Sequence, residues 1–334
     1  MNAKDRFYNH KMGVFNHFLS VLQNNPITPH SYGRHTDWDT LVREFDVSLV
    51  ARQLHEIGAG YYVLTVMQGE KYMIAPNAAF DRIAGTSPAE ACATRDLIWD
   101  LIRELEPYGI DLFLYFTGDG PYKSHPEGDR FGFVEPRERG VTRPFVERWA
   151  EVLREYSTRY GTHVKGWWID GCYRDYFRYT DDLLSLYYDA CKAGNPDALV
   201  ALNGGVSASL QANACFEDFT CGECTDFMTL PSSRFIGKAQ AHILAPLGTT
   251  PEGMPRDLVE DMIGPGWGQF GAKRDGDYLA DYVARVHEAG GVVTFDIGVY
   301  RDGKFDPIQM EILRYIRKKN PSLNSVENSP KNSL

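Results

Sequence analysis

Short apolar runs alternate along this chain with longer segments in which apolar residues recur at helical spacing. This alternation predicts parallel strands joined by crossover helices rather than a sandwich of antiparallel sheets. Because 334 residues match the length of one such barrel with extended loops, we expect a single (β/α)8 barrel over residues 1–319. The about eight strand-like runs are Met12 to Phe18, Tyr61 to Val66, Ile110 to Phe116, Val164 to Ile169, Leu199 to Asn203, Thr225 to Met228, Ala241 to Pro246 and Val292 to Ile297.

The segments between these runs carry apolar stripes that we expect to pack outside the barrel. Gly58 is a candidate helix end, and Pro144 stands at an early helical position. Residues 320–334 have no apolar period and are expected to form a disordered tail. The stripes are Leu41, Phe45, Leu49 and Ile57; Leu97, Leu101, Ile102 and Leu105; Trp149, Val152, Leu153, Tyr156 and Tyr160; and Leu279, Val283 and Val286.

Composition narrows the possible partners. A formal net charge of -10 disfavours nucleic acids and anionic membranes, which attract clustered Lys and Arg. The segment Met1 to Phe18 is polar from its start and lacks the apolar region of a signal peptide, so we expect a cytoplasmic protein. Six cysteines are too few for a disulfide scaffold in a chain of this length.

The sequence VKGWWIDG ends an apolar run with Asp170, where the chain must turn. In a parallel barrel this position faces the ligand crevice, so Asp170 is a candidate catalytic carboxylate, although it would also suit a helix cap. Trp168 before it is a candidate sugar-stacking surface. The long, Gly-rich and charged connection from Thr117 to Gly140 also follows a strand and is expected to be an active-site loop.

A second carboxylate is expected in the acidic segment CFEDFTCGECTDF, which lies about one βα unit beyond Asp170. Glycoside hydrolysis requires two carboxyl groups, roughly 5 Å apart in a retaining enzyme. The segment alone does not show which of its acids is the second carboxylate. Its members are Glu217, Asp218, Glu223 and Asp226.

Other local patterns are weaker. Cys221 and Cys224 have CxxC spacing but lack the second pair that structural zinc requires, so no metal is expected. The glycines around Trp267 match GxGxxG without the strand that should precede it, whereas Trp267 itself is a candidate sugar platform. His17 and Asp296 end the first and last strand-like runs and are candidates for substrate contact, each with a structural role as the alternative.

Several ordered motifs from about Lys11 to Leu313 resemble the α-L-fucosidases of glycoside hydrolase family 29. KMGVFNHF is similar to the family's opening K-F-G-(M/L)-F-I-H-W strand, and EIGAGYYVLTV to its A-G-A-K-Y-x-V-L-T strand. WWIDG is similar to the W-F-D-G motif, and GPGWGQFG to the S-W-G-Y loop. The longest match is GGVVTFDIGVYRDGKFDPIQMEILR, which resembles the closing G-G-N-L-L-L-N-I-G-P-x-x-D-G-x-I motif.

The resemblance implies a retaining exo-glycosidase that needs no cofactor and acts on an oligosaccharide or glycoside. Asp170 would be the nucleophile and Glu223 the general acid/base, with Glu217 as a competitor for the second role. His17 falls on the family's substrate-binding histidine. Trp168, Trp267, Asp296 and Gln68 are further candidates for substrate binding.

This chain departs from the family pattern at places that bear on the sugar. The paired histidines that hold the sugar in fucosidases align with Gln68 and Gly69, and the family's closing Asn is Asp296. The chain also ends shortly after the barrel. Two alternatives therefore stay open: a glycosidase of the same fold that acts on another L-configured or galacto-configured sugar, and a catalytically degenerate barrel that only binds carbohydrate.

Overall fold

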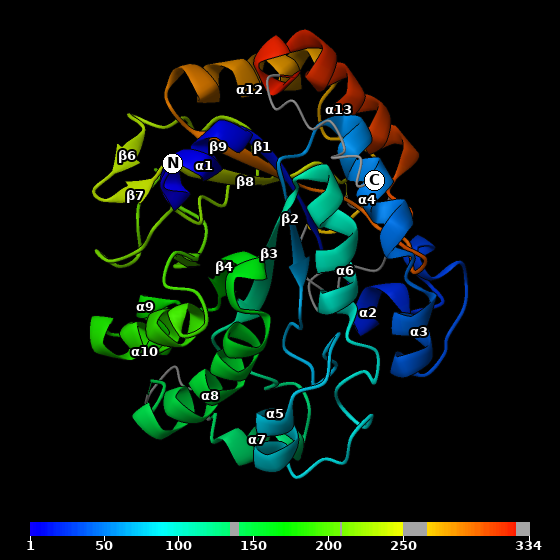
Figure 1. Cartoon of the computed structure of the whole chain (residues 1–334), viewed down its shortest axis with the longest axis vertical. Coiled ribbons are helices and arrows are strands. Elements are labelled where there is room, and N and C mark those ends of the chain that lie inside the picture. The colour runs from blue at the N-terminus through cyan, green and yellow to red at the C-terminus, as the bar shows by residue number, and fades with distance from the viewer. Residues whose placement is uncertain (134–139, 208, 250–265, 325–334) are drawn as a thin grey trace, which may run out of the picture.

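The central element is a curled sheet of seven parallel strands in the order β5-β4-β3-β2-β1-β9-β8 (Figure 1). The computed structural model describes residues 1–133, 140–207, 209–249 and 266–324. A separate antiparallel hairpin is formed by β6 (Phe235–Ile236) and β7 (Ala239–Gln240). The strands of the large sheet are β1 (Met12–Asn16), β2 (Tyr61–Thr65), β3 (Asp111–Thr117), β4 (Val164–Asp170), β5 (Leu199–Leu202), β8 (His242–Pro246) and β9 (Val292–Asp296).

Helices follow the strands and cover the outer face of the sheet (Figure 1). Neighbouring pairs pack together around this face, including α4 with α6, α8 with α10, and α12 with α13. The main helices are α1 (Ala3–His10), α3 (Trp38–Glu44), α4 (Val47–Ile57), α5 (Ala78–Ala84), α6 (Leu97–Leu105), α8 (Arg143–Tyr160), α10 (Asp181–Lys192), α12 (Gly276–Glu288) and α13 (Pro307–Lys319). Shorter ones are α2 (Ser20–Gln23), α7 (Glu127–Phe131) and α9 (Arg174–Phe177).

The sheet buries both of its faces, each in a separate apolar cluster. Successive side chains of a strand point to opposite faces, so one strand contributes to both clusters. In β4, Trp167 and Ile169 pack with the helices, whereas Trp168 lies in the inner cluster. Two apolar clusters on a parallel sheet are the arrangement that a barrel wall requires.

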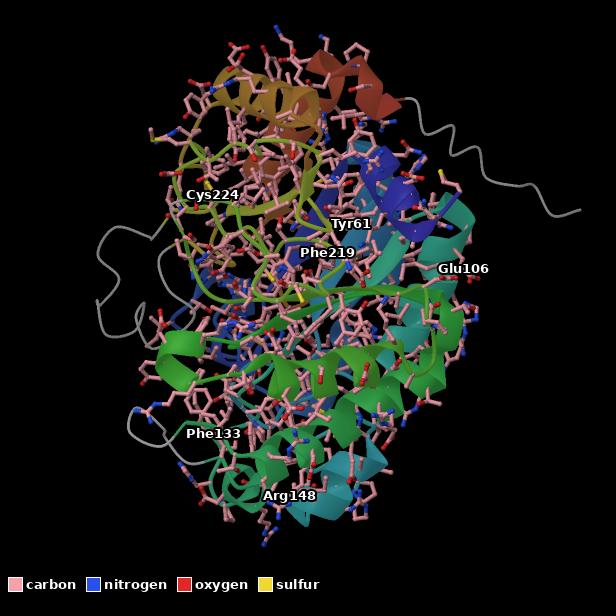
Figure 2. The ribbon with its side chains drawn as sticks, turned by 90° about the vertical axis from the view of Figure 1, so that its left-hand side faces the viewer. Tyr61, Glu106, Phe133, Arg148, Phe219 and Cys224 are labelled. Carbon is pink, nitrogen blue, oxygen red and sulfur yellow. The ribbon has the colours of Figure 1, made fainter. Side chains whose placement is uncertain are left out.

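Aromatic rings fill the inner face where glycines make room for them. A Cβ atom on Gly13 would lie 2.2 Å from the ring of Tyr61, and one on Gly166 would lie 2.3 Å from the ring of Phe113. Helix α1 adds Phe7, whose ring lies 4.9 Å from that of Tyr61 and 5.4 Å from that of Phe113. Figure 2 shows Tyr61 close to Phe219 in this interior.

Helix α1 is held across the amino-terminal edge of the sheet by charge pairs. The buried Asp111 at the start of β3 accepts hydrogen bonds from Arg6 Nε at 2.7 Å and pairs with His10 Nε2 at 2.7 Å. Lys4 Nζ lies 3.4 Å from Asp218 Oδ1. The catalytic edge of a parallel sheet is the opposite one, so these acids belong to the scaffold.

The sixth predicted strand, Thr225 to Met228, is wrong. The chain forms bends there, and the extended contacts lie earlier, at bridges from Phe219 to Gln240 and from Glu223 to Leu244. Asp218 N donates to Val200 O of β5 at 2.9 Å. The residues between Asp218 and Cys224 therefore lie in the space between β5 and β8. The prediction failed because polar and Gly/Cys-rich residues gave this segment no apolar run.

The helical stripes are confirmed with one correction. The stripe from Leu41 to Ile57 is divided into α3 and α4 at Asp46, whose side chain caps α4, and Leu49 is only partly buried. Gly58 ends α4 with φ of 73°, as predicted. At the predicted tail, Pro321–Asn324 forms a 3-10 turn and Leu323 is buried, while residues 325–334 lie outside the described part. Within the described ranges, no helix has both the length and the apolarity needed to cross a bilayer.

The close approach of Gly166 and Phe113 gives a stability prediction. We expect Gly166→Ala to lower the free energy of unfolding by about 1–3 kcal/mol, because the new methyl group overlaps the Phe113 ring. Denaturant unfolding of the variant measures this loss. The double variant Phe113→Leu/Gly166→Ala should lose less than the sum of the two single variants. Additive losses would show that the two positions do not compete for the same space.

Candidate active site

The candidate site forms where the inward-facing side chains reach the carboxyl-terminal edge of the strands. Every second residue faces the inner cluster, so the last inward position of β4 is Asp170 and that of β9 is Asp296. Asn203 takes the same position directly after β5, and Glu223 follows Cys221 of the inner cluster. Parallel strands bring these four side chains to one edge of the sheet.

Asp170 is held by donors from several elements. Tyr115 Oη on β3 donates to Asp170 Oδ2 at 2.6 Å, and Asn203 Nδ2 donates to Oδ1 at 2.8 Å. Tyr173 Oη donates to Oδ1 at 3.2 Å, and so does the Gly171 N–H at 2.7 Å. These hydrogen bonds fix the orientation of the carboxylate, and none of the donors carries a positive charge.

Asn203 connects Asp170 to Glu223. Its fully buried side-chain amide donates a hydrogen bond to Asp170, and the same amide lies close enough to Glu223 to lower the pKa of that carboxyl group. The Asn203 side-chain oxygen accepts from Gly205 N at 2.9 Å, which fixes the orientation of the amide. The two carboxyl groups therefore both lie beside one small amide.

The surroundings of Glu223 favour its protonated form. Burial, followed by the nearby charge of Asp170, raises its pKa to about 8, against the hydrogen bond from Asn203, which lowers it. A carboxyl group whose pKa is raised in this way can serve as a proton donor near neutral pH.

Glu217, the alternative second carboxylate, is engaged in the scaffold. Its Oε1 accepts from Leu202 N at 2.5 Å, and its Oε2 accepts from Ala214 N at 2.7 Å. Burial raises the pKa of Glu217 to about 8 as well. A raised pKa alone therefore does not separate the two acids, whereas their partners do: Glu217 joins backbone groups, and only Glu223 joins Asp170 through Asn203.

Asp119 is a further acid at this site that the sequence prediction did not single out. It belongs to the loop after β3, and a Cβ atom on Gly171 would lie 3.2 Å from its carboxyl carbon. Burial, and after it the charge of Asp170, raise the pKa of Asp119 to about 7. Its Oδ1 is buried without a hydrogen-bond partner among the described residues. The expectation of an active-site loop from Thr117 onward covered this residue without naming it.

His17 and Asp296 form a pair at the edge of β1 and β9. His17 Nδ1 lies 3.1 Å from Asp296 Oδ1, and both side chains are buried. The other carboxylate oxygen, Asp296 Oδ2, accepts from the backbone N–H of Gly268. Asp296 thus orients the imidazole ring of His17 and anchors the loop that carries Trp267.

The Trp267 loop is tied down on both sides. Gln309 Nε2 of α13 donates to the carbonyl oxygens of Gln269 at 2.9 Å and Gly271 at 2.7 Å, and His30 Nε2 contacts Gly268 O at 2.7 Å. The indole ring of Trp267 is 9% exposed and lies 6.3 Å from the ring of His17. This loop brings Trp267 to the edge of the site with little freedom to move.

Of the two other predicted binding residues, Trp168 is buried and Gln68 is partly exposed. Trp168 is 3% exposed and its ring stacks on Tyr115 at 5.3 Å, so it supports the ring that holds Asp170. Gln68 lies after β2, and its Oε1 is buried without a partner among the described residues. Gly69 O next to it accepts from Lys123 N at 2.8 Å, which joins the loops after β2 and β3.

The CxxC segment does not bring its sulfurs to one place. Cys221 belongs to the inner cluster and Cys224 to the outer one, and both thiols are free. Over the described ranges, no group of three or more His, Cys, Asp and Glu side chains is arranged to hold a metal ion.

Sequence comparison gives no relative: no family model matches the chain, and no curated protein matches it. Solved structures do match. An endo-fucoidan hydrolase of glycoside hydrolase family 107 aligns with a TM-score of 0.64 and 13% identity over 94% of this chain and 53% of its own. The chain thus spans about half the length of that enzyme. Another endo-fucoidan hydrolase of family 107 aligns at 0.65 and 13% identity over 95% of this chain and 93% of its own.

Family 29 structures align over a similar range. A bacterial fucosidase with an iminocyclitol inhibitor has a TM-score of 0.61 and 18% identity over 95% of this chain and 73% of its own. An α-L-fucosidase from Bacteroides thetaiotaomicron has a TM-score of 0.60 and 17% identity over 95% and 72%. At these identities the similarity shows the fold alone. The fold is the TIM-like one shared by glycoside hydrolases of families 29 and 107, and it does not single out family 29.

The buried Asp119 gives a pH-dependent prediction. The pKa of Asp119 in the folded protein, about 7, lies above the ordinary value of 3.8, so the folded protein holds a proton that the unfolded chain releases between these pH values. The stability contributed by this proton falls as the pH rises through that window. We expect Asp119→Asn, which cannot ionise, to gain on the order of 1–2 kcal/mol relative to wild type between pH 5 and pH 8.

Chemical unfolding of both proteins at the two pH values measures this difference. Asp175→Asn is a suitable control because Asp175 is exposed and follows the neighbouring strand β4. An equal gain for Asp119→Asn at both pH values would contradict the raised pKa.

Proposed function

We propose that this chain is a retaining glycoside hydrolase of the α-L-fucosidase type that removes a terminal sugar, with Asp170 as nucleophile and Glu223 as general acid/base. The observation that carries the proposal is the Asn203 amide between the two carboxyl groups. Glu223 lies close enough to Asp170 for the charge of Asp170 to raise its pKa, and a retaining mechanism needs two carboxyl groups that lie close together. The eight-stranded barrel belongs to the same proposal, with the segment from Asp218 to Cys224 as its remaining wall.

In the first step Asp170 attacks the anomeric carbon, and the glycosidic bond breaks as Glu223 gives its proton to the leaving oxygen. The sugar is then an ester of Asp170. In the second step the Glu223 carboxylate takes a proton from water, whose oxygen attacks the anomeric carbon and releases Asp170. A covalent intermediate trapped in the Bacteroides thetaiotaomicron fucosidase supports this mechanism for a chain of the same fold.

His17, Trp267, Asp296 and Gln68 are the residues that we propose to contact the sugar. His17 and Asp296 offer a fixed pair of polar groups, and Trp267 offers a ring edge beside them. Asp119 joins this set because its partnerless oxygen can accept from a sugar hydroxyl. Because Gln68 and Gly69 stand where family 29 has a histidine pair, a related L-configured or galacto-configured sugar is the second candidate substrate.

The decisive experiment replaces the nucleophile. We expect Asp170→Gly to lose hydrolysis of the aryl glycoside that wild type cleaves, in a panel of α- and β-glycosides that includes fucosides and L-galactosides. Azide, which fits the space of the missing carboxylate, should restore turnover and yield a glycosyl azide. Asp218→Gly, a carboxylate at the opposite edge, is the control for azide effects elsewhere. Full activity of Asp170→Gly without azide would refute the assignment.

The pH profile tests the role of Glu223. Since Glu223 must hold its proton to donate it, kcat/KM should fall as the pH rises through about 8. Asn203→Ala removes the hydrogen bond that lowers this pKa, so the alkaline limb should move to higher pH while the rate drops. Asn195→Ala removes a buried amide at the far edge of β4 and should leave the limb in place. If the alkaline limb of Asn203→Ala stays at the wild-type pH, the proposed influence of the Asn203 amide on Glu223 is wrong.

A further inference from the structure

Glu223 borders two hollows that Asp170 does not line. The first has a volume of about 340 Å³ and lies between the loops after β4 and β5. The second has a volume of about 380 Å³ and lies between the loop after β5 and residues 223–229. Ser207, Glu223 and Thr229 line both, so the two hollows adjoin. Cys224, labelled in Figure 2, lines the second.

The position of these hollows indicates on which side of the scissile glycosidic bond they lie. Asn203 and Tyr173 line the first hollow and donate hydrogen bonds to Asp170, so they separate it from the nucleophile. In a retaining glycosidase the nucleophile and the proton donor flank the scissile bond, and the donor lies on the side of the leaving group. A leaving group protonated by Glu223 would therefore enter the hollows that Glu223 borders.

The lining suits uncharged hydroxyl-rich groups. Side chains of Ser207, Ser209, Gln211, Asn213 and Thr229 supply hydroxyl and amide groups, and Tyr173 and Tyr176 supply rings. Such neutral donors and acceptors bind sugar hydroxyls, and the tyrosine rings suit a sugar face.

The charge of the lining disfavours an anionic group. Arg174 is the one cation among the described residues that line either hollow. Its guanidinium is already engaged by the carboxylate of Asp181 and by Asn213, whose Oδ1 accepts from Arg174 Nε at 2.9 Å. The remaining ionisable groups in the lining are the acids Asp175, Glu223 and Asp226. A sulfate or carboxylate on the leaving group would meet acids without a free cation to pair with.

We infer that the two hollows form a subsite for an uncharged saccharide leaving group of about two sugar rings, a size that their volumes accommodate. This inference rests on the proposed function, since it assigns the side of the scissile bond from the role of Glu223. It names the substrate class as neutral oligosaccharides rather than sulfated or acidic ones.

The test fills the hollows and compares two substrates. Ser207→Trp places a large ring where the hollows adjoin, and Ser232→Trp makes the same change at an exposed position outside their lining. The ratio of kcat/KM for fucosyllactose to that for an aryl α-L-fucoside should fall at least about tenfold in Ser207→Trp and stay unchanged in Ser232→Trp. An unchanged ratio in Ser207→Trp would overturn the inference and leave the proposed function intact.

Direct binding separates the inference from catalysis. Ligand-observed NMR should detect lactose binding to wild type and to Ser232→Trp, with loss of the signal in Ser207→Trp and weaker binding of lactose sulfate. If wild type cleaves neither substrate but binds lactose in this Ser207-dependent way, the proposed function fails and the hollows stand as a saccharide-binding site without the leaving-group role. Absence of lactose binding to wild type, or tighter binding of lactose sulfate, would overturn the subsite.

Discussion

Burial of both faces of a parallel sheet is the constraint on which the rest of this structure depends. Each strand must place one set of side chains against the helices and the other against the aromatic interior, where Tyr61 and Phe113 fit only beside glycines. The same alternation directs the last inward side chains, Asp170 and Asp296, to the carboxyl-terminal edge. The same alternation of side chains therefore determines both the packing of the interior and the placement of the candidate site.

Burial at this edge affects three carboxyl groups in the same direction, although their contacts differ. Burial raises the pKa of Asp119, Glu217 and Glu223, yet the three acids have different surroundings. Glu217 accepts backbone N–H groups and ties the segment after β5 to the sheet. Glu223 shares the Asn203 amide with Asp170, whereas Asp119 keeps an oxygen without a partner. A raised pKa therefore indicates only that an acid is buried, whereas its hydrogen-bond partners indicate what it does in the structure.

The loops at this edge are fixed through the strand ends. Asp296 holds both the ring of His17 and the backbone at Gly268, and Gln309 holds the same loop from α13. Beyond it, the rings of Phe270, Tyr300 and Tyr32 stack in sequence at 4.6 and 4.7 Å. Such a supported loop keeps a binding residue in place before a ligand arrives, which lowers the entropic cost of binding.

The sequence by itself determined the alternation of strands and helices, seven of the eight strand positions and the placement of Asp170 at a strand end, because these depend on local period and on the rule that ligands meet the carboxyl ends of parallel strands. It did not locate the extended contacts around Phe219 and Glu223, which come from pairing with Gln240 of β7 and Leu244 of β8 rather than from a local apolar run. Nor did it distinguish Glu223 from Glu217, or find Asn203 and Asp119. The surroundings of these residues arise from contacts between residues that are distant in the chain, and only the folded sheet brings them together.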